Sequence, residues 1–158
     1  MKTLEFPNKQ IRAQAIKEYL PLTGKTKVVC FSCGNATRAL INAGVKTLAI
    51  APEGDFIANR WFTQAEIASM FPDYFDATSG HLPMELMKEI GARFKNYLGT
   101  LDGEYMVPTG SGETIVCLKL AYPGVKFYAK YNLNEATEYS IYAPLNEMVE
   151  IMADGVEY

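Results

Sequence analysis

Two short turns rich in small residues constrain the fold of this chain more than any other feature. One covers residues 32–35 and the other residues 110–114, and each follows a short apolar run and precedes a helix-like segment. A turn of this kind exposes backbone N–H groups at the positive end of the helix that it opens. Such a helix end can bind an anion, for example a phosphate or a carboxylate.

The segments around these turns alternate between short apolar runs and stretches with helical periodicity. The pattern predicts strands over residues 27–31, 46–51, 74–77, 105–108 and 125–131. It predicts helices over residues 9–20, 36–43, 63–71, 83–98 and 112–122. This alternation indicates an α/β fold, which we expect to be a single-domain three-layer sandwich over residues 1–158. Its sheet is expected to be mostly parallel with about five strands, and to present both turns at its carboxyl edge, where ligands bind.

Local signals support several of the helix ends. Asn8 is expected to cap the first helix, and Pro21 is expected to stop it. Thr63 and Glu66 have the spacing of a capping box, in which the side chain of each residue binds the backbone of the other. Gly44 is expected to end the second helix.

Charge and composition exclude several classes of function. The net charge is −3, which argues against a nucleic-acid-binding protein. No apolar run is long enough to span a bilayer, and the first residues lack the apolar stretch of a signal peptide, so a cytoplasmic protein is expected. The odd number of cysteines, three, does not suggest a disulfide framework. A sheet of this size is expected to need a partner at its edge, which favours a homo-oligomer.

Lys9 and Arg12 precede the two turns in an order that resembles the fold-type II pyridoxal-phosphate enzymes. This is the family of tryptophan synthase β, threonine dehydratase and cysteine synthase. Its members have a lysine at a helix start, a strand followed by a (Ser/Thr)-x-Gly-Asn turn, and a later glycine-rich phosphate turn. The counterparts here are Lys9, residues 32–35 and residues 108–114, so the resemblance covers most of the chain.

The resemblance implies that Lys9 forms a Schiff base with pyridoxal phosphate and that Asn35 binds the ring hydroxyl of this cofactor. It also implies two groups of binding residues. The phosphate would be bound by Gly110, Ser111, Gly112 and Thr114. The carboxylate of a substrate would be bound by Ser32, Gly34 and Thr37. The implied activity is a lyase or β-replacement reaction on a small amino acid.

The chain also departs from the family. Members are usually longer, with a second small domain between the two turns, and they commonly have a glycine where Glu113 stands here. A carboxylate at that place repels a phosphate unless its side chain points to solvent. Ser140 and Glu147 are the candidates for the partner of the pyridine nitrogen. These departures leave two alternatives open: a non-catalytic Rossmann-like module that binds a nucleotide or a phosphorylated metabolite, and a scaffold that has lost its site.

Cysteine and histidine side chains raise one further alternative. Cys30, Cys33, Cys117 and His81 could be combined into a zinc site. Cys30 and Cys117 fall inside a predicted strand and a predicted apolar helix, and we interpret them as core thiols instead. His81 has no evident acid–base partner nearby in the sequence and is interpreted as a helix cap.

Overall fold

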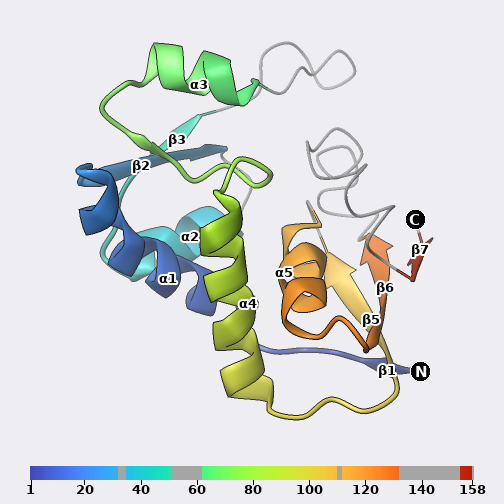
Figure 1. Cartoon of the computed structure of the whole chain (residues 1–158). Coiled ribbons are helices and arrows are strands. Elements are labelled where there is room, and N and C mark those ends of the chain that lie inside the picture. The colour runs from blue at the N-terminus through green and yellow to red at the C-terminus, as the bar shows by residue number, and fades with distance from the viewer. Residues whose placement is uncertain (32–34, 51–61, 110–111, 132–153, 158) are drawn as a thin grey trace.

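The computed structural model describes residues 1–31, 35–50, 62–109, 112–131 and 154–157, and strands and helices alternate along them (Figure 1). The strands are β1 (Lys2–Thr3), β2 (Lys27–Phe31), β3 (Lys46–Ile50), β4 (Phe75–Asp76), β5 (Glu104–Thr109), β6 (Lys126–Tyr131) and β7 (Gly155–Glu157). The helices are α1 (Asn8–Thr23), α2 (Asn35–Asn42), α3 (Gln64–Met70), α4 (Met84–Leu98) and α5 (Glu113–Ala121).

All the described strand pairs are parallel, which confirms the predicted α/β fold. The strands lie in two sheets, however, rather than in one sheet of about five. One sheet has the order β3-β2-β4, and the other has the order β1-β5-β6-β7. The sequence pattern did not predict β1 and β7. They have two and three residues, too few to show a periodicity of their own, and they extend the second sheet by pairing with β5 and β6.

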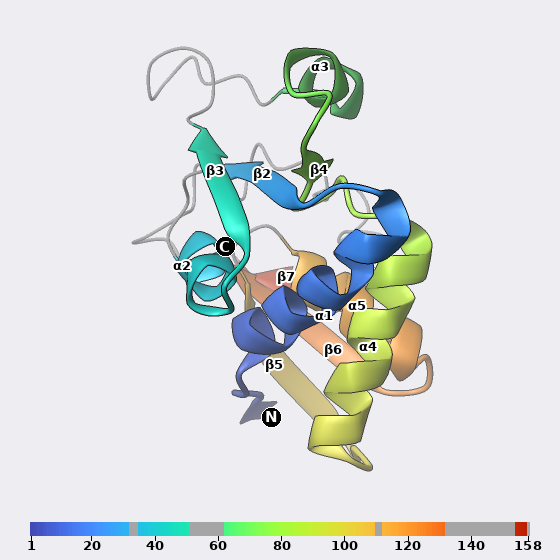
Figure 2. The ribbon, with the colours of Figure 1, turned by 90° about the vertical axis from the view of Figure 1, so that its left-hand side faces the viewer.

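A continuous core joins the two sheets through the helices. α4 packs against both α1 and α5, and Figures 1 and 2 show it running alongside them. Val28 of β2, Ile90 of α4 and Phe127 of β6 belong to the same buried cluster and are all 0% exposed. The helices therefore connect the two sheets through one shared core.

α4 and α5 approach each other closely at one glycine. A Cβ atom built on Gly91 would lie 2.3 Å from the carbonyl oxygen of Cys117, well inside van der Waals contact. The glycine therefore permits a helix–helix contact that no other residue type would allow without a backbone shift. This contact fixes the position of α5, whose first residues form part of the candidate site.

α3 belongs to a smaller cluster on the β3-β2-β4 sheet. Val29 of β2 and Ile67 of α3 are buried together there. The predicted capping box at the start of α3 is confirmed, because Glu66 N donates to Thr63 Oγ1 at 3.2 Å and Thr63 N donates to Glu66 Oε1 at 3.1 Å. None of the described helices has the length and apolar character needed to cross a bilayer.

α1 differs from its sequence prediction at both ends. Pro7, not Asn8, is the N-cap residue, and the side chain of Asn8 is directed to another helix. Pro21 does not stop the helix but lies within its last turn, where the missing N–H removes a single backbone hydrogen bond. The helix ends instead at Gly24, whose φ of 74° lies in the left-handed region that favours glycine.

Candidate functional site

The start of α5 is a helix end without a side-chain cap. Gly112 is the N-cap residue, with φ 92° and ψ −3°, and a glycine has no side chain that could cap the first backbone N–H groups. The first N–H groups of a helix have no partner within the helix, and they point along its positive end. Gly110 and Ser111, which the sequence analysis assigned to the same turn, lie outside the described residues.

Thr109 lies just before this turn, at the carboxyl end of β5. The residue is 7% exposed, and the structure gives its Oγ1 atom no hydrogen-bond partner among the described residues. A buried hydroxyl without a partner costs about 1–3 kcal/mol, so one that persists calls for an explanation such as a ligand or an ordered water. The positive end of α5 and this hydroxyl together fit an oxyanion.

The beginning of α1 is joined to the beginning of α5 by one hydrogen bond. Asn8 Nδ2 donates to Thr114 Oγ1 at 3.0 Å, across 106 residues of sequence. The other side-chain atom of Asn8, Oδ1, accepts from the backbone N of Lys9 at 2.8 Å. The half-buried Lys9 is thus next in sequence to a residue that contacts the second glycine turn.

The charge of Lys9 also acts on α5. The pKa of Cys117 lies well above its ordinary value of 9.0, first because the thiol is buried and then because Glu113 is nearby. The positive charges of Arg12 and Lys9 oppose this rise. Lys9 is therefore close enough to α5 for its positive charge to lower the pKa of Cys117 in that helix.

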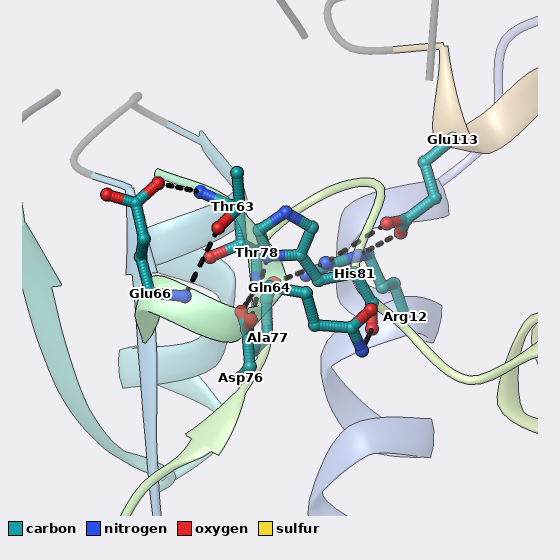
Figure 3. Close-up of polar contacts among 9 residues, drawn as sticks. All are labelled: Arg12, Thr63, Gln64, Glu66, Asp76, Ala77, Thr78, His81 and Glu113. Carbon is teal, nitrogen blue, oxygen red and sulfur yellow. Dashed lines mark hydrogen bonds and ion pairs between the residues drawn. The ribbon is translucent and has the colours of Figure 1, made fainter. Parts of the chain in front are cut away.

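Glu113, the first residue of α5, does not point to solvent. It is 3% exposed and pairs with Arg12 of α1, which is 5% exposed (Figure 3). Arg12 Nε bonds to Glu113 Oε1, and Arg12 Nη2 donates to Glu113 Oε2 at 3.4 Å and to the carbonyl oxygen of Ala77 at 2.7 Å. Burial lowers the pKa of Arg12, but the adjacent carboxylate of Glu113 outweighs it, and the pKa is raised overall. The ion pair leaves the turn without an uncompensated carboxylate.

The first glycine turn is described only in part. Asn35 begins α2 and is exposed, whereas Thr37 is buried and its Oγ1 lies 3.3 Å from Cys30 Sγ. Ser32, Cys33 and Gly34 lie outside the described residues, as do Ser140 and Glu147. The assigned roles of these residues in binding a cofactor or a substrate stay predictions.

His81 has a partner that the sequence analysis missed. Its Nδ1 lies 2.7 Å from Asp76 Oδ2, and the two side chains are 5% and 15% exposed. His81 precedes α4, yet no side-chain hydrogen bond caps that helix, so the interpretation of His81 as a helix cap is wrong. The signal available was a carboxylate five residues before the histidine, but the intervening loop has no periodicity from which to infer their contact.

The interpretation of Cys30 and Cys117 as buried core thiols is confirmed. Cys30 in β2 and Cys117 in α5 are buried in the main core, and neither is part of a disulfide. Within the described ranges, no group of three or more His, Cys, Asp or Glu side chains is arranged to hold a metal ion. Cys33, the third cysteine, falls outside those ranges.

Comparison of the chain with protein-family models and with curated proteins gives no match. Among solved structures, the chain is similar to serine racemase from Dictyostelium discoideum, at 16% sequence identity and a TM-score of 0.55 over 94% of this chain. It spans 64% of the length of that racemase. It is also similar to a pyridoxal 5'-phosphate-dependent aspartate racemase, at 14% identity and a TM-score of 0.45 over 78% of this chain and 46% of that one.

The likeness to serine racemase concerns the fold. At this level of identity the comparison does not transfer an activity. The α/β fold of this chain is shared with serine racemase from Dictyostelium discoideum.

Proposed function

We propose that this chain binds pyridoxal phosphate, with Lys9 as the residue that carries the cofactor and the turn at residues 110–114 as its phosphate site. The observation that carries this proposal is the 3.0 Å hydrogen bond between Asn8 and Thr114. It joins the start of the helix that bears Lys9 to the start of the helix that would bind the phosphate. The fold shared with serine racemase supports the same assignment.

The residues around the second turn fit a phosphate group. The first N–H groups of α5 and the hydroxyl of Thr109 would donate hydrogen bonds to it. Glu113 is the obvious objection, because a lone carboxylate would repel the phosphate. Its pairing with Arg12 removes that objection, since the two opposite charges are held together by direct hydrogen bonds.

The chemistry proposed for the site acts on the Cα of a small amino acid. When bound, the cofactor draws electrons away from this carbon, so that one of its bonds can break. Lys9 must lose its ammonium proton before it can attack an aldehyde. Lyase and β-replacement reactions, which we infer from the sequence resemblance, and the racemase reaction named for the similar structure from Dictyostelium discoideum all involve a change at this carbon.

A second function is also favoured by one observation. The uncapped start of α5 and the hydroxyl of Thr109 fit any phosphate-bearing ligand, and neither depends on Lys9. A non-catalytic module that binds a nucleotide or a phosphorylated metabolite is therefore the alternative.

A titration with pyridoxal phosphate separates these functions. We expect the full chain to develop a visible absorbance band that Lys9→Ala abolishes. Lys88→Ala is the matched control, because Lys88 is exposed on α4 and its replacement leaves the band unchanged. A band of equal strength in Lys9→Ala would contradict the role of Lys9. Binding of inorganic phosphate by the unmodified chain, with no visible band on adding pyridoxal phosphate, would favour the non-catalytic module.

A further inference from the structure

We propose that His81, held in place by Asp76, is a proton-transfer group of the same site. This inference rests on the proposed function and adds to it a residue that the sequence resemblance does not assign. The imidazole and the carboxylate lie 2.7 Å apart and are both largely buried. No other histidine occurs in the chain.

The surroundings fix the orientation and the tautomer of the ring. A carboxylate only accepts hydrogen bonds, so Asp76 Oδ2 requires a proton on Nδ1 of His81. The second oxygen, Oδ1, accepts from the backbone N of Thr78 at 3.0 Å, which holds the carboxylate itself. The backbone N of His81 donates to Thr78 O at 2.9 Å. A neutral ring held in this way presents an unprotonated Nε2, the arrangement that lets a histidine accept a proton.

Two polar atoms of this loop have no partner in the described part of the chain. The structure gives His81 Nε2 no hydrogen bond there. Thr78 Oγ1 is buried and unpartnered as well, in a residue that is 1% exposed. A polar ligand could bond to both atoms, and native structures rarely leave a buried hydroxyl such as that of Thr78 without a partner.

A chain of contacts connects this pair to the cofactor site. Ala77, between Asp76 and Thr78, accepts a hydrogen bond from Arg12, and Arg12 binds Glu113 at the start of α5 (Figure 3). Arg12 lies one helical turn after Asn8, so both project from the same side of α1. Asn8 contacts Thr114, the residue after Glu113. The same side of α1 thus touches both the phosphate turn and the loop that carries the histidine.

The proposed step is an exchange of one proton. The Cα–H bond of the bound amino acid breaks, its electron pair stays on the substrate, and the proton forms an N–H bond at Nε2 of His81. The imidazolium that results is stabilised by the adjacent carboxylate of Asp76. Return of the proton to Cα restores the neutral ring, so no oxidant, reductant or further reactant is needed.

The tautomer can be read directly, because a 15N spectrum of the imidazole reports a single histidine. We expect the Nδ1–H form in the full chain without added ligand, and a mixture of forms in Asp76→Asn. Asp73→Asn, an exposed carboxylate of the same region, is the control and leaves the spectrum unchanged. Adding L-serine to the protein loaded with pyridoxal phosphate should shift the Nε2 resonance. An Nε2–H tautomer in the wild type, or no shift with L-serine, would overturn the proposal.

The kinetic test is the exchange of the Cα proton of L-serine for deuterium in D2O. His81→Asn should retain the visible absorbance of bound pyridoxal phosphate and lose about 100-fold or more in the exchange rate. Asp76→Asn should also lower the exchange rate, which keeps the proposal testable if His81→Asn does not fold. Exchange at the wild-type rate in a folded variant of either kind would refute the role of His81, and so would a wild type that binds the cofactor without any exchange. Failure of the wild type to bind the cofactor is a separate outcome, seen in the absorbance, and it would reject the proposed function together with this inference.

Discussion

The guanidinium of Arg12 and the carboxylate of Glu113 bond to each other across 101 residues of sequence, with only 6% and 4% of their side chains exposed. The pair links α1 to α5, and its third contact, to Ala77 O, reaches the loop after β4. It thereby joins the three segments that build the candidate site. It also explains how a glutamate can stand at the start of the helix for which we propose phosphate binding.

Removing one member of this buried pair should destabilise the fold severely. In Arg12→Met the carboxylate of Glu113 is left buried without its partner, and we expect a loss of about 3–5 kcal/mol in the free energy of unfolding. The double variant Arg12→Met/Glu113→Met should regain most of this loss, because no charge is then left buried. Urea denaturation measures both values. Arg93→Met, which breaks more exposed ion pairs, should cost less than about 1 kcal/mol. Simple addition of the losses from the two single variants would contradict the coupling of the pair.

Removing one charge or the other from the Arg12–Glu113 pair should change the affinity for an anion in opposite directions. Glu113→Gln removes the negative charge and leaves Arg12 uncompensated near the start of α5, so the affinity for inorganic phosphate should rise. Arg12→Met leaves the carboxylate alone, so that affinity should fall. Calorimetric titration of phosphate into the folded variants measures both, and Arg93→Met should match the wild type. A change in the same direction for both variants would show that the charges do not act on an anion at this turn.

Gly91→Ala tests the close contact between α4 and α5. The added Cβ would lie 2.3 Å from the backbone carbonyl oxygen of Cys117, so the helices must move apart. We expect a loss of about 1–3 kcal/mol, typical of overpacking, although alanine is the better helix former. Gly124→Ala is the control, because a Cβ atom added at Gly124 would meet nothing within 4 Å among the described residues. A thermal midpoint of Gly91→Ala equal to that of the wild type would disprove the tight contact.

The carboxylate of Asp154 should make stability depend on pH. Burial raises its pKa, but the Phe127 N–H and the Lys119 ammonium outweigh that effect, so the pKa lies below its ordinary value of 3.8. A folded-state pKa that is lowered stabilises the fold above the unfolded-state pKa, and this contribution is lost as the pH falls through the folded-state pKa. Asp154→Asn should therefore be less stable than the wild type at pH 7, with a difference that closes below pH 3.8. A gap between Asp154→Asn and the wild type that stays constant over this pH range would contradict the assignment.

Periodicity and turn chemistry predicted the main elements because these features are local. Residues 27–31 form β2 as predicted, Thr63 and Glu66 form their capping box, and Gly44 follows α2 with a positive φ. The division of the strands into two sheets could not be predicted in the same way. It depends on which strands pair, and β4 is a strand of only two residues that pairs with β2.

The contacts that build the site were beyond sequence reasoning for a different reason. Asn8 and Thr114 are 106 residues apart, and no local pattern tells a capping asparagine from one that reaches another helix. Glu113 was recognised as an obstacle to phosphate binding, but its pairing with Arg12 depends on how α1 packs beside α5. Lys9 and the glycine turns could be proposed from the sequence because a resemblance of order and spacing needs no knowledge of packing.

The most direct test of the account identifies the residue that carries pyridoxal phosphate. The full chain is incubated with the cofactor, reduced with borohydride and digested, and the modified peptide is sequenced by mass spectrometry. The account predicts one reduced cofactor group per chain, on Lys9, and its loss in Lys9→Ala but not in Lys88→Ala. Modification spread over exposed lysines, or equal labelling of Lys9→Ala, would contradict the central claim that this fold holds the cofactor through Lys9.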